Sequence, residues 1–215
     1  MSRRSFARPH GSAGRILLLA ALSIALTPAL ALALPATDFS FADASTLSLD
    51  FDEIAMSQST VITNQYEAGY GVTFSPNVWY ENNRGALGWD GDNFANFQTG
   101  TSTVNTTIEV IFSGTVTAVA MEFAANDGNA FEFTALRAGS VVETTVFSYG
   151  TCCAAAVYGL RDIEFDTLRI RHDSGGSAFF IADQLTWNAV PEPGTAILLG
   201  LGLGILARRP RATRG

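Results

Sequence analysis

The middle of the chain consists of short runs in which apolar and polar residues alternate, and this pattern constrains the fold most strongly. From Val119 to Phe123, and again from Phe131 to Phe133, apolar residues alternate with polar or small ones. A spacing of two is typical of half-buried strands, because successive side chains of a strand point to opposite faces. The 3.6-residue period of an amphipathic helix is almost absent there. The middle is therefore predicted to be all-β.

Nine such runs are separated by turn-forming sequences. They are Leu47–Asp52, Gly71–Ser75, Thr107–Phe112, Val116–Ala124, Ala130–Arg137, Val141–Tyr149, Ala155–Tyr158, Thr167–His172 and Ala178–Trp187. Asn126–Asn129 contains Asp-Gly and predicts a hairpin turn, because this pair tolerates positive φ angles. Arg137–Ser140 predicts a second, looser turn. Short strands without intervening helices favour one antiparallel β-sandwich, over residues 34–189.

The distribution of charge excludes nucleic acid as a partner. The sequence has 20 acidic residues against 13 basic ones, all of them arginine. Eight arginines lie in the two tails, which leaves 5 against 19 acidic residues between Leu34 and Val190. A nucleic-acid binder needs a basic face. An acidic domain is instead typical of a soluble extracellular protein, and its carboxylates are ligands that hard cations prefer.

Residues 1–33 contain the parts of a secretory signal peptide. Four arginines at positions 3, 4, 8 and 15 precede the apolar run Ile16–Leu26, and alternating alanines follow in Ala29–Ala33. This order predicts export and cleavage by signal peptidase. Arg3-Arg4 also resembles the twin-arginine motif, so both the Sec and the twin-arginine routes remain open.

The C-terminal segment, residues 190–215, has three parts in a fixed order. Pro191-Glu192-Pro193 precedes the apolar stretch Thr195–Ala207, and an arginine cluster follows. This arrangement resembles the PEP-CTERM sorting signal of Gram-negative bacteria, which in that family is cut by an exosortase, a membrane protease. The resemblance implies a transient inner-membrane anchor, followed by release to the cell surface or the extracellular matrix.

The physical properties of this segment agree with such a role. Two prolines prevent a helix at Glu192 and hold the backbone extended, as a protease cleft requires. The terminal arginines keep the tail on the cytoplasmic side of the membrane. Gly194–Ala207 spans 14 residues, or about 21 Å as a helix, against a hydrocarbon core of about 30 Å. A short helix of this kind suits a temporary anchor.

A second resemblance concerns the two ends of the predicted domain. Leu49–Ile54 and Phe179–Trp187 are similar to the first and last strands of secreted jelly-roll domains, among them carbohydrate-binding modules. Such modules often hold a structural Ca²⁺ between these strands. The resemblance implicates Asp52 or Glu53 together with Asp183. The alternative interpretation is that these carboxylates are simply solvated.

The segment after Val78 places large aromatic residues among polar ones and is expected to be a loop. Aromatic faces beside amides and carboxylates suit a sugar ring, so one interpretation is a glycan-binding patch. It would consist of Trp79, Tyr80 and Trp89, with Asn82, Asn83 and Asp92 as polar contacts. The other interpretation is that these aromatic residues fold back and cover one end of the core. Trp187, in a terminal strand, is expected to be a core residue.

The remaining reactive side chains do not indicate a catalytic site. Cys152 and Cys153 are the only cysteines and are adjacent, so they could form a strained ring, pair with another chain or stay reduced. After removal of the signal peptide, His172 would be the only histidine, and the chain has no lysine. We expect a non-catalytic surface or matrix protein without a required cofactor. The alternatives are a glycan-binding module of the exopolysaccharide matrix and a small carbohydrate-active enzyme built on two carboxylates.

Overall fold

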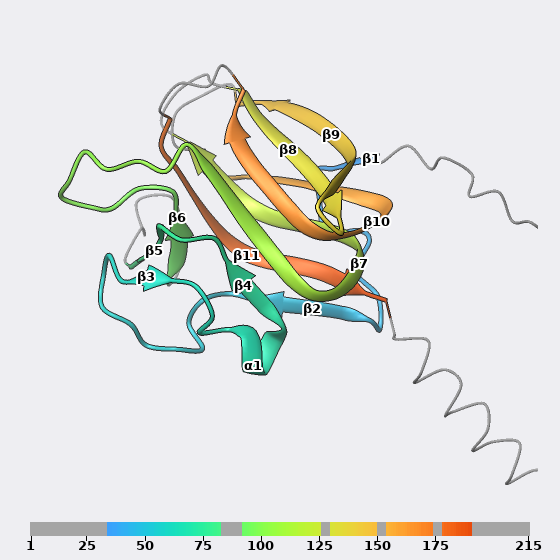
Figure 1. The fold of residues 1–215 in the computed structure, drawn as a ribbon, viewed down its shortest axis with the longest axis horizontal. Coiled ribbons are helices and arrows are strands. Elements are labelled where there is room, and N and C mark those ends of the chain that lie inside the picture. The colour runs from blue at the N-terminus through green and yellow to red at the C-terminus, as the bar shows by residue number, and fades with distance from the viewer. Residues whose placement is uncertain (1–33, 83–91, 126–129, 150–153, 174–177, 191–215) are drawn as a thin grey trace, which may run out of the picture. The chain divides into compact units, whose positions relative to one another are not determined.

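The computed structural model describes residues 34–82, 92–125, 130–149, 154–173 and 178–190, which form an antiparallel β-fold with one short helix (Figure 1). The elements are β1 (Leu34–Ala36), β2 (Thr46–Leu49), β3 (Val61–Ile62), α1 (Glu67–Tyr70), β4 (Val72–Phe74), β5 (Val78–Glu81), β6 (Asn93–Ala95), β7 (Thr107–Ala125), β8 (Ala130–Arg137), β9 (Ser140–Ser148), β10 (Ala156–His172) and β11 (Phe180–Ala189).

Two long strands, β7 and β10, divide the fold into two layers. The second half of β7 pairs with β11 and with the first half of β10, which also pairs with β1. The first half of β7 pairs instead with β4 and with the second half of β10, beyond which β8 and β9 follow. Both strands bend where their register shifts, and Asp162 in β10 adopts a φ of 63° there. The result is a β-sandwich, as predicted from the alternation.

We call the two parts layer 1 and layer 2. Layer 1 comprises β1, the first half of β10, the second half of β7, β11, β2, β6, β5 and β3. Layer 2 comprises β4, the first half of β7, the second half of β10, β8 and β9. Layer 2 has one face on the core and one face exposed to solvent, and the exposed face carries the candidate site.

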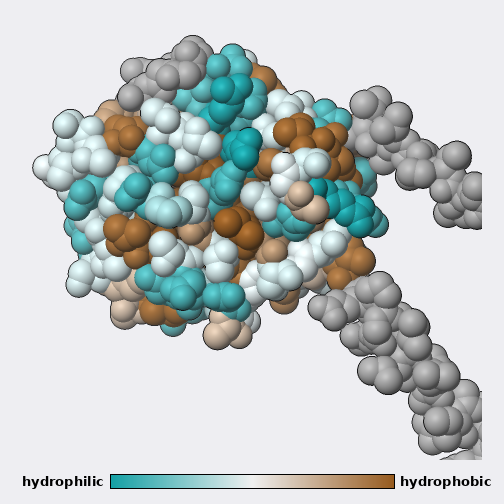
Figure 2. Space-filling model, in the orientation of Figure 1, coloured by the Kyte–Doolittle hydropathy of each residue, from teal (hydrophilic) through white to brown (hydrophobic). Residues whose placement is uncertain are grey.

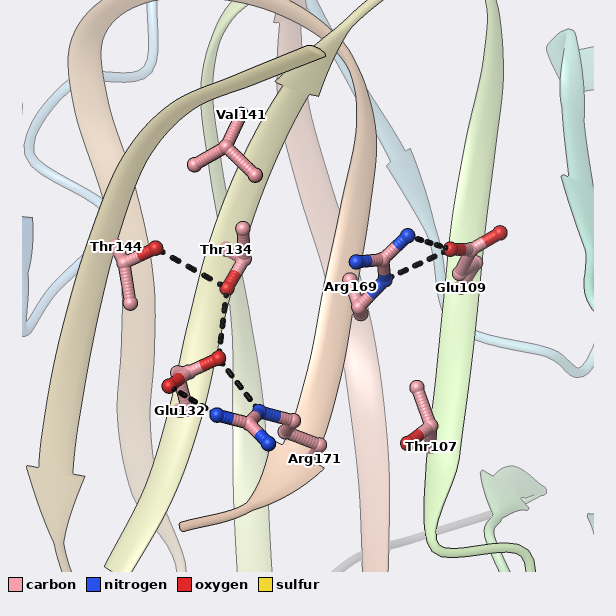
Figure 3. Close-up of a pocket in the computed structure, with 8 residues that line it drawn as sticks. All are labelled: Thr107, Glu109, Glu132, Thr134, Val141, Thr144, Arg169 and Arg171. Atoms are coloured by element: carbon pink, nitrogen blue, oxygen red, sulfur yellow. Dashed lines mark hydrogen bonds and ion pairs between the residues drawn. The ribbon is translucent and has the colours of Figure 1, made fainter. Parts of the chain in front are cut away.

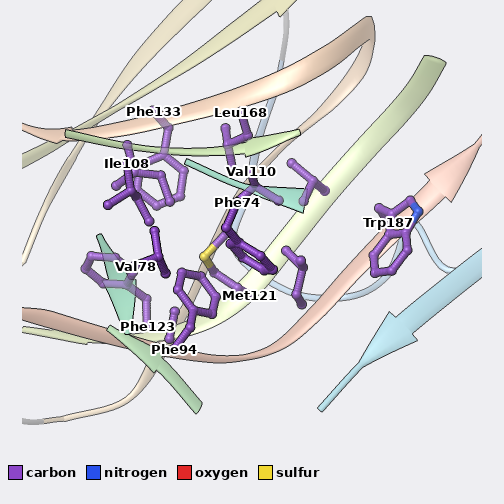
Figure 4. Packing of buried hydrophobic residues seen from close by; sticks show 14 of the residues in the cluster. Phe74, Val78, Phe94, Ile108, Val110, Met121, Phe123, Phe133, Leu168 and Trp187 are labelled. Carbon is purple, nitrogen blue, oxygen red and sulfur yellow. The ribbon is translucent and has the colours of Figure 1, made fainter. Parts of the chain in front are cut away.

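Aromatic side chains fill the space between the layers (Figure 4). Phe123 of layer 1 stacks on Phe180 with ring centroids 4.7 Å apart and meets Phe133 of layer 2 edge-on at 5.8 Å. Trp187 is 2% exposed and contacts Phe112 across the core. The sequence-based prediction that Trp187 is a core residue is therefore confirmed.

The predicted strands differ from the observed ones in continuity. The runs Thr107–Phe112 and Val116–Ala124 are two halves of β7, whose 19 residues continue through Ser113-Gly114-Thr115. Likewise, the two predicted runs beginning at Ala155 and Thr167 belong to the 17-residue strand β10. The intervening polar residues mark bends between the layers instead of chain reversals, because each strand serves both layers.

The predicted turns, loop and terminal segments have different outcomes. The turn at Arg137–Ser140 is confirmed, with Ala138 and Gly139 at positive φ angles of 49° and 78° between β8 and β9. The loop expected after Val78 is wrong at its start, because Val78–Glu81 is strand β5. The turn at 126–129, the signal peptide and the C-terminal anchor lie outside the described residues. Within the described ranges, no helix has the length and apolar character needed to cross a membrane.

Candidate functional site

The exposed face of layer 2 carries two parallel rows of polar side chains. In the first row, Glu109 of β7 lies opposite Arg169 of β10, which lies opposite Thr134 of β8 and then Thr144 of β9. The second row is displaced by two residues along each strand and consists of Thr107, Arg171, Glu132 and Val146. The alternation of each strand produces these rows, because the intervening residues point into the core.

Each row contains an arginine–glutamate ion pair (Figure 3). Arg169 donates from its Nε and one terminal nitrogen to Glu109 Oε1, both at 2.8 Å. Arg171 binds Glu132 with two hydrogen bonds, Nε to Oε1 at 2.7 Å and Nη2 to Oε2 at 2.8 Å. All four side chains come from residues that are paired across neighbouring strands, so the sheet itself holds them in place.

Hydroxyl groups extend the Arg171–Glu132 ion pair across the face towards β9. Thr134 donates to Glu132 Oε1 at 3.1 Å, and its hydroxyl lies 3.3 Å from that of Thr144 (Figure 3). The hydrogen bonds from Arg171 lower the pKa of Glu132, although its partial burial opposes this effect, and they raise the pKa of Arg171. Glu132 is therefore a carboxylate at neutral pH and Arg171 is a cation.

These side chains surround a hollow of about 460 Å³, lined by Thr107, Glu109, Glu132, Thr134, Val141, Thr144, Arg169 and Arg171. We call this set the layer-2 hollow. Arg171 remains 44% exposed despite its ion pair, and Arg169 35%. The hollow thus offers guanidinium donors, carboxylate acceptors and hydroxyl groups to a ligand that lies on the sheet.

This site is not among those that the sequence predicts. The sequence does contain a signal for it, because the polar positions of the alternating strand pattern are charged at Glu109, Glu132, Arg169 and Arg171. These positions lie up to 62 residues apart in the chain. Only the pairing of β10 with β7 and β8 brings them together. That strand order cannot be predicted from local sequence patterns.

The aromatic residues predicted as a glycan patch occupy a different part of the fold. Trp79 and Tyr80 lie in β5 and are 3% and 1% exposed, so neither presents a ring face to solvent. The Tyr80 hydroxyl donates to Asp92, and burial raises the pKa of Tyr80 to about 12. Asn82 is half-buried beside them. Asn83 and Trp89 lie outside the described residues.

The predicted calcium ligands lie near one end of layer 1. The backbone N–H of Asp92 donates to Asp52 Oδ1 at 2.8 Å, and the N–H of Asp50 donates to Glu53 Oε1 at 3.3 Å. In the part of the chain that the structure describes, no three His, Cys, Asp or Glu side chains are arranged to hold a metal ion. Asp52, Glu53 and Asp183 are thus not a preformed site, and calcium binding stays a prediction.

Asp183 is nevertheless an unusual carboxylate. It is 9% exposed, and this burial raises its pKa to about 7, although the N–H of Gln184 donates to it. The negative charges of Glu122, Asp50 and Asp52 add to the effect of burial. Glu122 is the direct cross-strand partner of Asp183. A proton therefore binds Asp183 at a pH where most carboxyl groups are ionised.

The predicted cysteine pair and sorting motif cannot be placed in the fold. Cys152 and Cys153, together with Pro191, Glu192 and Pro193, lie outside the described residues. The described chain ends with Val190, whose N–H donates to Thr115 O at 2.8 Å. The sequence of the C-terminal segment, however, can be compared with known families.

These features define an antiparallel β-sandwich with a polar, ion-paired sheet face. Residues 189–212 match the family model described as the PEP-CTERM protein-sorting motif. The predicted C-terminal sorting signal is thereby confirmed. This motif implies an exported protein that an exosortase processes during sorting to the cell surface. No curated protein matches the sequence.

Solved structures with a similar fold include two kinds of domain. The K1 cleaved adhesin domain of Lys-gingipain from Porphyromonas gingivalis has a TM-score of 0.40 and 14% identity, over 68% of this chain and 99% of that domain. A mutant of CBM29-2, a family 29 carbohydrate-binding module, has a TM-score of 0.37 and 15% identity, over 61% of this chain and 92% of the module. The K2 adhesin domain of Lys-gingipain has a TM-score of 0.35 and 13% identity, over 73% of this chain and 99% of that domain.

Proposed function

We propose that this chain is a non-catalytic protein of the cell surface or extracellular matrix, and that its β-sandwich binds a glycan in the layer-2 hollow. The observation that carries the proposal is the presence of two solvent-accessible arginine–glutamate ion pairs on one sheet face, one of which, Arg171–Glu132, is extended by the hydroxyls of Thr134 and Thr144. The sandwich is the cargo that the sorting motif brings to the outside.

A glycan fits the chemistry of the hollow. Sugar hydroxyls both donate and accept hydrogen bonds, and each ion pair offers a donor and an acceptor side by side. The strands fix these groups before binding, which reduces the entropy lost when the ligand is held. Carboxylates beside both arginines disfavour a phosphate-rich ligand, since the positive charge is already balanced.

The same proposal replaces the aromatic patch suggested by the sequence. A stacking platform needs an exposed ring, and the rings of Trp79 and Tyr80 are buried in β5. We therefore assign glycan contacts to Arg169, Arg171 and their partners, and a structural role to β5. An exopolysaccharide of the matrix is the ligand class that its export favours.

Maturation would proceed through two processing enzymes. Signal peptidase would remove residues 1–33, and the C-terminal helix would hold the chain in the inner membrane until exosortase cuts near Pro191-Glu192-Pro193. Released from the membrane, the acidic domain would remain soluble among polysaccharides of the matrix.

Glycan-array binding of the purified full-length chain in mild detergent tests the proposal. We expect Arg169→Ala to weaken binding about tenfold, the effect of losing roughly one charged hydrogen bond. Arg137→Ala is the matched control, because it removes an exposed Arg–Glu pair, with Glu164, that does not line the hollow. Equal binding by both variants, or no glycan bound by the parent chain, would overturn the proposal.

The enzymatic alternative has its own readout. Release of reducing sugars from any bound polysaccharide, abolished by Glu109→Gln or Glu132→Gln, would identify a carbohydrate-active enzyme in place of a binding module. We expect the polysaccharide to be bound and recovered intact.

A further inference from the structure

Strand β9 is the long open edge of the fold. It stands last in the strand order, and within the described residues it pairs with β8 alone (Figure 1). The strands at other edges are short, with 3 residues in β1, 4 in β2, 2 in β3 and 3 in β4, whereas β9 has 9. An edge of this length presents a row of backbone groups on which another strand can pair.

The devices that usually protect such an edge are largely missing from β9. It contains no proline, lysine or arginine, and Glu143 is its one charged residue. A bulge against β8 falls at Val142, which leaves Glu143–Ser148 in regular register. Val141, Val142 and Val146 are 62%, 43% and 47% exposed. Figure 2 shows hydrophobic residues gathered in the part of the view that β9 occupies in Figure 1.

The sequence of β9 is nearly symmetric about Thr144. If two copies of the strand pair antiparallel around this residue, the opposed pairs nearest the axis are Val142 with Val146, Glu143 with Thr145, and Thr144 with itself, and the bulge at Val142 ends the regular ladder before Val141. Apolar residues then meet apolar residues, and polar ones meet polar ones. Each Glu143 faces a threonine of the other copy instead of another carboxylate, which avoids like-charge repulsion in the ladder.

We propose that β9 pairs with β9 of a second copy of this chain, antiparallel about a two-fold axis at Thr144. Val142, Thr144 and Val146 alternate on the exposed face, so Val142 of each copy packs against Val146 of the other. The domain has 19 acidic residues between Leu34 and Val190 and only one lies on β9. The edge is thus where two such domains can approach with little charge repulsion.

Pairing in this register would join two copies of layer 2 into one continuous sheet. Both layer-2 hollows would then lie on the same face, because residues directly opposite in an antiparallel pair share a face. Val141 and Thr144, which line the hollow, are themselves on β9. Two adjacent hollows would give a repetitive ligand two contacts at once, but the self-association does not depend on whether the hollow binds a glycan.

A charge-reversal pair of variants tests both the interface and its register. Val142→Lys with Val146→Lys places lysine opposite lysine twice across the axis, whereas Val142→Lys with Val146→Glu places lysine opposite glutamate twice. Both variants share Lys at 142, and both positions are exposed, so the two variants should affect folding equally. Circular dichroism checks that both are folded. The molar mass of the full-length chain in mild detergent is measured by sedimentation equilibrium.

We expect the parent chain to dimerise, the lysine–lysine variant to dimerise at least about tenfold more weakly, and the lysine–glutamate variant to recover the parent affinity. A parent chain that is monomeric at about 100 µM overturns the proposal. Equal dimerisation of the two variants also overturns it, because it would assign the association to another surface, such as the C-terminal segment.

Discussion

At the scale of single residues, Asp183 gives the fold a pH dependence of unusual sign. Its pKa is raised by burial from 3.8 to about 7 in the folded domain. Between pH 4 and 7 the folded state therefore holds a proton that the unfolded chain has released, so stability is full below about pH 4 and falls as pH rises. We expect about 2 kcal/mol less stability at pH 7.5 than at pH 4.5 from this group, after allowing for solvent screening.

Denaturant titrations at several pH values, with EDTA present, would measure this effect. Asp183→Asn should remove the decline, because asparagine does not titrate. Asp43→Asn is a suitable control, since hydrogen bonds from Ser45 lower the pKa of exposed Asp43 and its effect has the opposite sign. An unchanged pH profile in Asp183→Asn would show that another group is responsible.

Single residues also show how far sequence patterns can be used. Trp187 was correctly predicted as core because it ends an apolar strand run. Trp79 and Tyr80 could not be assigned in the same way, because all four residues of β5 are buried and the strand shows no alternation. Glu81 at its end is 0% exposed, yet it accepts hydrogen bonds from Gln58, Ser59 and Thr99. Such partners cannot be identified before the fold is known.

At the scale of secondary structure elements, the pairing of β7 with β10 depends on one glycine. Gly159 lies opposite Ala120. A Cβ at this position would lie 2.0 Å from the carbonyl oxygen of Val119 and 2.6 Å from Ala120 Cα, both backbone atoms that cannot move independently. Gly159→Ala should therefore lower the free energy of unfolding by about 3 kcal/mol, since it forces the two central strands apart.

The chain offers a matched control for this prediction. Gly114 lies at the bend of β7, where an added Cβ would meet nothing within 4 Å. Gly114→Ala should change stability by less than about 1 kcal/mol. Urea unfolding of the two variants compares them directly, and similar midpoints would refute the proposed close approach of the strands.

The elements also show what limited the prediction of the site. Strand type followed from the alternation in Thr107–Phe112, Ala130–Arg137 and Thr167–His172. The partner of each strand did not, because antiparallel pairs far apart in sequence leave no local signal. The same limit explains why the bends of β7 and β10 were interpreted as turns: a Ser-Gly-Thr sequence is compatible with both a reversal and a bend.

At the scale of the whole molecule, the sorting motif that follows the β-sandwich determines where the protein is delivered. The sequence alone was sufficient here, because the order of motif, apolar stretch and arginines needs no tertiary structure to be recognised, and the family match at residues 189–212 agrees. Replacing Pro191-Glu192-Pro193 with three alanines should abolish processing, since alanines allow the apolar helix to extend through the cleavage region. We expect the uncut chain to accumulate in the membrane fraction of a host that contains exosortase.

Thr195→Ala provides the control, because it changes the apolar stretch by one residue and leaves both prolines in place. Immunoblots of membrane and secreted fractions, with one antibody against the sandwich and one against the C-terminal arginines, distinguish cut from uncut chains. The sandwich of the triple-alanine variant should fold normally, because the described strands end at Ala189, before the substitutions. Equal release of both variants would mean that the enzyme recognises the apolar helix and the arginines, and that the extended backbone at Glu192 is dispensable.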